Sequence, residues 1–119
     1  MGQPTNLVVL TGHVTSLPSR RSLRSGVDVV NFDVATSVDG DTTSVPIAWY
    51  DPRDSAVSSF EPGDEIVVVG SVRRRFFRVG GQTQSRTEVV VATLVPTRRT
   101  KSARSALAAA AAMITQGGE

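Results

Sequence analysis

The residues best suited to bind a ligand follow an apolar run, where three arginines and two phenylalanines stand together within Gly63–Arg78. Side chains two positions apart in an extended strand point to the same side, so Arg73, Arg75 and Phe77 would share one face. Guanidinium groups neutralise phosphates and an aromatic ring stacks on a base, a combination typical of proteins that bind single-stranded nucleic acids. A solvated β-hairpin with charged edges is the alternative that the same pattern allows.

The charge of the chain is distributed unevenly along its 119 residues, although the formal net charge is only +2. Residues 1–70 carry four basic and nine acidic groups, whereas residues 71–119 carry nine basic and two acidic groups. Twelve of the 13 basic residues are arginine, which binds phosphate through a planar, bidentate group. This asymmetry predicts a polyanionic partner.

Composition excludes several other kinds of site. The chain has no cysteine and one histidine, His13, so we expect no disulfide framework, no catalytic thiol and no histidine or thiolate metal site. The carboxylates show no spacing that pairs them with a base or a nucleophile, among them Asp28, Asp33, Asp51, Asp54 and Glu61. We therefore expect no enzyme, no cofactor and no small-molecule substrate.

The chain contains no segment typical of a membrane protein. Its longest apolar run, Leu107–Ile114, is well short of the roughly 18 residues of a membrane span. The first residues lack a basic region that leads into an apolar one. The expected location is the cytoplasm.

Five strands and one short helix are predicted to position the candidate residues. Hairpin turns are predicted at Asp39-Gly40 and Gly80-Gly81, and Asp51-Pro52 is typical of a helix start between the third and fourth strands. Ser16–Gly26 is interpreted as a loop or a short strand. Five strands with short connections favour an all-β domain, and a small barrel if the sheet closes. The strands are expected at Leu7–Val14, Val27–Val38, Thr42–Tyr50, within Gly63–Arg78 and at Thr87–Val95.

The composition changes after Pro96, so we place a boundary between a domain at residues 1–97 and a basic linker with an alanine-rich segment at residues 98–119. Alanine is the best helix former, which predicts a helix over Ala103–Ile114. Its apolar stripe would consist of Leu107, Ala111 and Ile114. Such a helix suits packing on the barrel or on a neighbouring subunit, and a frayed, exposed tail is the alternative.

Several fragments between about residue 6 and residue 95 follow the order and spacing of a known family: Asn6–Gly12, Leu17-Pro18 with Arg21, Asn31–Ser37, Val45–Tyr50, Gly63-Asp64, Val69–Arg73 and Thr87–Val91. In these fragments the chain resembles the bacterial single-stranded DNA-binding proteins. The resemblance implies a five-stranded oligonucleotide/oligosaccharide-binding barrel, the OB fold. It also implies a homo-oligomer, a tetramer or a dimer, that coats single-stranded DNA during replication, repair and recombination.

The resemblance also suggests which residues touch DNA. Phe77 and Trp49 are similar to family positions whose rings stack on bases, and Arg73 and Arg75 are similar to basic positions of the same strand as Phe77. Tyr50 points to the opposite side of its strand from Trp49, so a packing role or a turn role competes with a base contact. A core tryptophan is the alternative for Trp49. Further phosphate contacts are expected from Arg20, Arg21, Arg24, Arg53 and Arg86.

The chain departs from the family pattern in three places. Val38-Asp39-Gly40 and Thr43 stand where the family usually has aromatic residues, so two stacking rings are missing. The last residues, Ile114–Glu119, lack the acidic tip that family members use to recruit other enzymes. These departures leave two alternatives to single-stranded DNA binding. One is a diverged OB-fold interaction module or accessory subunit, and the other is a protein that binds RNA or structured DNA.

Overall fold

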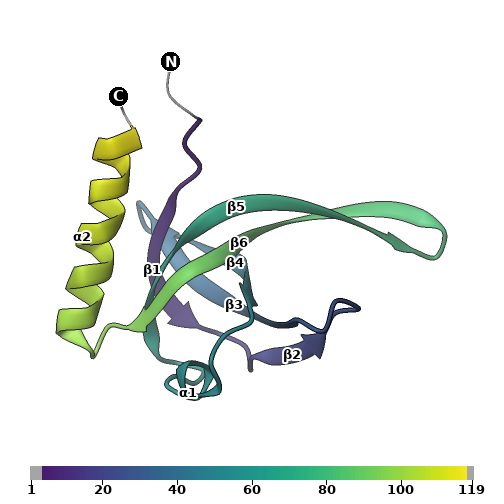
Figure 1. The fold of residues 1–119 in the computed structure, drawn as a ribbon, viewed down its shortest axis with the longest axis horizontal. Helices are drawn as coiled ribbons and strands as arrows, with labels where there is room; N and C mark the ends of the chain where they lie inside the picture. Colours follow the sequence, from purple (N-terminus) through teal and green to yellow (C-terminus); the bar gives the residue numbers. More distant parts are fainter. Residues whose placement is uncertain (1–3, 118–119) are drawn as a thin grey trace.

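The structure, a computed structural model, describes residues 4–117 and is built mainly from β-strands (Figure 1). Its two helices are a single turn before β5 and a longer helix that follows the last strand. In chain order the elements are β1 (Val8–Val14), β2 (Ser19–Ser22), β3 (Asp28–Val38), β4 (Asp41–Tyr50), α1 (Asp54–Val57), β5 (Glu65–Val79), β6 (Gln82–Pro96) and α2 (Thr100–Gly117).

The strands form one sheet that closes into a barrel. Its order is β1-β5-β6-β4-β3-β2, and β1 also pairs with β3 through His13 and Val14. Five strands therefore form a closed ring, while β2 lies outside it on the edge of β3. The β4–β6 pairing is parallel and the other pairings are antiparallel. The predicted five-stranded barrel is confirmed, and a sixth strand is added to it.

The added strand changes the expected position of the short helix. Part of the segment Ser16–Gly26 is strand β2, so α1 lies between the fourth and fifth strands of the sheet rather than between the third and fourth. It still follows the strand that ends at Tyr50. The sequence left this segment open as a loop or a short strand, because a four-residue strand without apolar residues carries no periodic signal. The expected helix position did not count it as a strand.

Both predicted hairpin turns are confirmed. Asp39 and Gly40 have φ values of 52° and 86°, and Gly80 and Gly81 have φ values of 57° and 81°. Two successive positive φ angles match the right-handed twist of the strands on either side, which is why such turns favour glycine, asparagine and aspartate. Each turn has two residues, so it fixes the register of the strands that it joins.

The second of these turns closes a long two-stranded ribbon. β5 and β6 pair from Ile66 opposite Pro96 to Val79 opposite Gln82. β6 therefore begins earlier than the predicted Thr87. Residues 72–88 of the ribbon, here called the arm, extend beyond the barrel (Figure 1). A bulge between Val69 and Gly70 shifts the register of the ribbon just before the arm begins.

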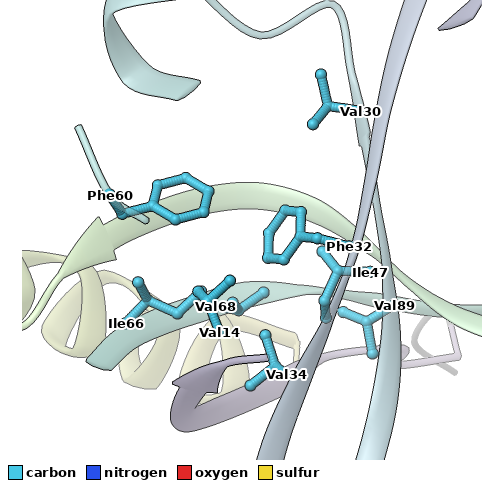
Figure 2. Packing of buried hydrophobic residues seen from close by; sticks show 9 residues of the cluster. All are labelled: Val14, Val30, Phe32, Val34, Ile47, Phe60, Ile66, Val68 and Val89. Atoms are coloured by element: carbon cyan, nitrogen blue, oxygen red, sulfur yellow. The ribbon is translucent and has the colours of Figure 1, made fainter. Parts of the chain in front are cut away.

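The inward-facing side chains of the strands form the core (Figure 2). Phe32 and Phe60 lie at its centre, with ring centroids 5.2 Å apart. On β5 the core takes alternate residues, Ile66 and Val68, as expected for a strand. The other members of the cluster are Val14, Val30, Val34, Ile47 and Val89.

Helix α2 packs on the outer side of β5. Its contact face consists of Ala103, Ala106 and Ala110, which lie against Val67 and Val69. The helix and its packing on the barrel agree with one of the expectations from the sequence. The predicted stripe was wrong, because Leu107 and Ile114 are exposed and the alanines are buried. Small side chains let a helix approach a strand closely, and alanine fits that contact better than larger residues.

Candidate nucleic-acid interface

The two faces of the arm follow from its register. Directly opposite residues of an antiparallel pair lie on the same side of the sheet. Arg73 lies opposite Glu88, Arg75 opposite Arg86, and Phe77 opposite Gln84. We call this set of residues the first face. Arg73, Arg75 and Phe77 share it, as the alternation in the sequence predicts, and the Arg75 guanidinium carbon lies 5.1 Å from the centroid of the Phe77 ring.

A buried carboxylate anchors the first face. Glu88 is only 2% exposed. Its Oε2 accepts a hydrogen bond of 2.7 Å from Nη2 of Arg73, and its Oε1 lies 3.6 Å from Nε of Arg75. A buried carboxylate is costly unless it is paired. Glu88 therefore holds both guanidinium groups near the base of the arm, and the side chains of Arg73 and Arg75 remain 42% and 31% exposed.

Tyr50 joins the first face from β4. The guanidinium carbon of Arg73 lies 5.0 Å from the centroid of the Tyr50 ring, and Arg73 also donates a hydrogen bond to the Tyr50 hydroxyl. The hydrogen bonds to Tyr50 and Glu88 raise the pKa of Arg73 above its ordinary value, so this group stays charged. The result is a continuous row of Tyr50, Arg73, Arg75 and Phe77, in which aromatic rings and cations touch.

Arg86 extends the first face toward β3. Its Nη2 lies 3.7 Å from Oδ1 of Asp33. Asp33 is two positions from Asn31 and four from Val29, and Val29 pairs with Tyr50, so Asp33 and Tyr50 lie on the same side of the sheet. The outer surface of β3, β4 and β6 therefore continues into the first face of the arm.

The arginines on and near β2 differ in whether they pair with a carboxylate. Arg20 donates hydrogen bonds to Asp28 at 3.1 Å and to Asp54 at 2.9 Å. Hydrogen bonds from Ser22 and Arg20 lower the pKa of Asp28, which keeps this carboxylate ionised. Arg21 instead lies opposite Val29, on the side of the sheet that carries Tyr50, and it is exposed.

Two further predicted phosphate contacts lie apart from this row. Arg24 is exposed in the turn between β2 and β3, where the Leu23 amide donates to the Val27 carbonyl. Arg53 is exposed at the N-cap of α1. The structure therefore brings together Tyr50, Arg73, Arg75, Phe77 and Arg86, with Arg21 on the same side of the sheet, and it leaves Arg20, Arg24 and Arg53 outside the row.

Trp49 lies on the opposite side of β4 from Tyr50. It lies opposite Val30, on the inner side of β4, and packs against the core. Its ring is stacked on Phe60 with a centroid distance of 6.3 Å and an interplanar angle of 29°. The pleat of the strand sends the two adjacent rings to opposite sides, and the packing of Trp49 is the alternative that the sequence left open for it. A base contact by Trp49 stays a prediction.

Glu88 is the residue of this site that the sequence interpretation missed. The signal that identifies it is the Gly80-Gly81 turn, because a two-residue turn places Val79 opposite Gln82. Counting back along both strands from this pair puts Glu88 opposite Arg73. A lone carboxylate in a basic arm is then the expected partner of the arginines across the ribbon.

Residues 4–117 hold no group of three or more potential ligands that could bind a metal ion. In the same part of the chain, no helix is long and apolar enough to cross a membrane.

Comparison with known proteins identifies the family. The sequence profile of the Single-strand binding protein family matches residues 5–96. The chain belongs to the single-strand binding protein family. The match covers the whole barrel and the arm. It ends before α2. No curated protein is significantly similar to the chain.

A solved structure supports the same fold for this single-strand binding family member. It is the Plasmodium falciparum SSB in complex with single-stranded DNA, with a TM-score of 0.67 and 21% sequence identity. The similarity covers 79% of this chain and 96% of the Plasmodium chain. The closed five-stranded barrel is consistent with the OB fold that the resemblance implies.

Proposed function

We propose that this chain binds single-stranded DNA, largely without sequence preference, and catalyses no reaction. The observation that carries the proposal is the partly exposed row of Tyr50, Arg73, Arg75 and Phe77, in which two strands bring aromatic rings and guanidinium groups into contact. Membership of the single-strand binding protein family supports it. The Plasmodium SSB of the same fold was solved in complex with single-stranded DNA.

Each part of the row has a defined task in this proposal. Phe77 and Tyr50 offer ring faces on which bases stack, and stacking tolerates any base because every base has a π-face. Arg73 and Arg75 neutralise phosphates between those bases. Glu88 keeps the two guanidinium groups in place at the base of the arm, where they stay charged and oriented before DNA arrives. Binding of this kind releases counterions and weakens as salt is added.

The cellular setting is part of the same proposal. A protein that coats single-stranded DNA acts in replication, repair or recombination, and as a homo-oligomer it engages one strand with several barrels. With stacking rings missing at Val38 and Thr43, the arm supplies a larger share of the affinity. A folded chain that does not bind oligo-dT would favour the alternative of a protein interaction module.

Exchanging single arginines tests whether phosphate contacts lie where we propose. Arg21→Ala is expected to reduce the slope of log affinity against log salt by about 0.7, the value for one phosphate contact on a single strand. Arg20→Ala is the matched control from the next residue. We expect it to leave the slope unchanged, because Arg20 has two carboxylate partners of its own, Asp28 and Asp54, and lies on the opposite side of the sheet from Arg21. The measurement is fluorescence anisotropy of a labelled oligo-dT at four salt concentrations. If both variants keep the wild-type slope, the interface does not extend to β2.

A further inference from the structure

The arm has a second face that the row of Tyr50, Arg73, Arg75 and Phe77 does not use. Arg74 lies opposite Thr87, Phe76 opposite Ser85, and Arg78 opposite Thr83. We call these six residues the second face. Its β5 residues, Arg74, Phe76 and Arg78, lie on the same side of the strand as the core residues Ile66 and Val68, because they all occupy even positions of β5. This side is buried inside the barrel and opens to solvent where the arm extends beyond it (Figure 1).

An aromatic ring and a cation are in contact on the second face, as they are on the first. The guanidinium carbon of Arg74 lies 5.3 Å from the centroid of the Phe76 ring. Arg74 also donates a hydrogen bond of 3.0 Å to the hydroxyl of Ser85 across the ribbon. Phe76 is 63% exposed, so its ring does not serve the core. An exposed ring beside a cation is the combination that stacks bases and neutralises phosphates in proteins that bind single-stranded nucleic acids.

The arginines of the second face have fewer carboxylate partners than the arginines of the first face. On the first face, Arg73 and Arg75 share Glu88, and Arg86 lies near Asp33. Among residues 4–117, neither Arg74 nor Arg78 has a carboxylate within ion-pair distance. Arg78 is bonded to the carbonyl of Gly81 at 2.6 Å and to the hydroxyl of Thr83 at 3.4 Å. Both partners are neutral, so the full positive charge of the second face is available to a polyanion.

We propose that the second face is a further contact for single-stranded nucleic acid, so that one long strand lies along both sides of the arm. The inference rests on the function proposed above and extends it to a second surface. The chemistry agrees: Phe76 stacks a base, Arg74 and Arg78 neutralise phosphates, and the hydroxyl groups of Thr83, Ser85 and Thr87 can bond to phosphate or base edges. The ribbon is only two strands wide, about 5 Å between strand axes, so a flexible strand can pass around its edge.

The adjacent phenylalanines make a matched pair for the test. Oligo-dT of about 6 nucleotides, near the low end of the site sizes of OB folds, is short enough to occupy one face, whereas about 16 nucleotides can reach both. We expect Phe76→Ala to change the affinity for the short oligomer by less than about twofold and to weaken binding of the long one by about fivefold or more. Phe77→Ala should weaken binding of both. Arg74→Gln should reduce the salt slope by about 0.7 for the long oligomer alone.

Other outcomes would overturn the inference in distinguishable ways. If Phe76→Ala and Arg74→Gln bind both oligomers like the wild type while Phe77→Ala binds both weakly, the second face makes no contact and the proposed function stands. If Phe76→Ala weakens both oligomers and Phe77→Ala neither, the chain has one DNA-binding face, formed by the even positions. If Phe76→Ala changes only the mass of the protein in solution, the second face contacts another copy of the chain. If the wild type binds neither oligomer, the proposed function fails first.

Discussion

Replacing Tyr50 and Phe77 together by alanine is expected to weaken the affinity for a short oligo-dT by about 30-fold or more. Each stacked base is worth about 1 to 3 kcal/mol, and the double variant removes two stacking rings from the first face. The remaining arginines would still attract DNA, so the residual binding should depend on salt as steeply as that of the wild type. The measurement is anisotropy of labelled oligo-dT at low salt, with thermal unfolding recorded for both proteins.

The matched control for this prediction is Phe76→Ala, which removes a ring of the same arm from the opposite face. On a short oligomer it should leave the affinity within about twofold of the wild type. A variant that lacks Tyr50 and Phe77, keeps its fold and binds as tightly as the wild type would show that the row of aromatic and cationic groups is not the binding surface.

The second large effect is expected from the arginines that share Glu88. Replacing Arg73 and Arg75 together by alanine leaves a carboxylate that is 2% exposed without its cations. Breaking a buried pair in this way costs about 3 to 5 kcal/mol, and we expect the low end because both guanidinium groups are partly exposed. The same variant loses two phosphate contacts, so the salt slope of oligo-dT binding should fall by about 1.4.

Adding Glu88→Gln separates these two effects. The triple variant no longer buries an uncompensated charge, so we expect the free energy of unfolding in urea to recover most of its loss. Its salt slope should remain as low as that of the double variant, because the arginines are still absent. A triple variant that is no more stable than the double variant would contradict the anchoring role of Glu88.

Much of the fold could be predicted from local patterns in the sequence. The β-branched run within β5 and the two turns with positive φ are strong signals, because each depends on residues that are neighbours in the chain. The first face of the arm was predictable for the same reason. A solvent-exposed ribbon has few tertiary contacts to override the alternation of its side chains.

The remaining features depend on partners that are distant in the sequence. β4 is covered on both sides, with Ile47 and Ala48 both buried, so its alternation did not show which of Trp49 and Tyr50 faces outward. The pairings with β3 and β6 decide this question. The formation of strand β2 likewise depends on its pairing with the edge of β3.

Helix α2 shows a different limit of sequence interpretation. Its largest apolar residues, Leu107 and Ile114, are exposed, whereas the residues that pack against Val67 and Val69 are alanines. Which stripe of an alanine-rich helix is buried is decided by the surface that it meets. The predicted domain boundary at residue 97 lies between the last strand and this helix.

The most direct test of the proposed function is titration of the wild-type chain with labelled oligo-dT at low and moderate salt. For a short oligomer we predict saturable binding at low salt that weakens with a log–log slope of about −3, if Arg21, Arg73, Arg75 and Arg86 each contact one phosphate. Competition with RNA of the same length would show whether the arm prefers DNA. The absence of saturable binding at low salt, by a chain that is folded, would contradict the proposal that this single-strand binding family member binds single-stranded DNA.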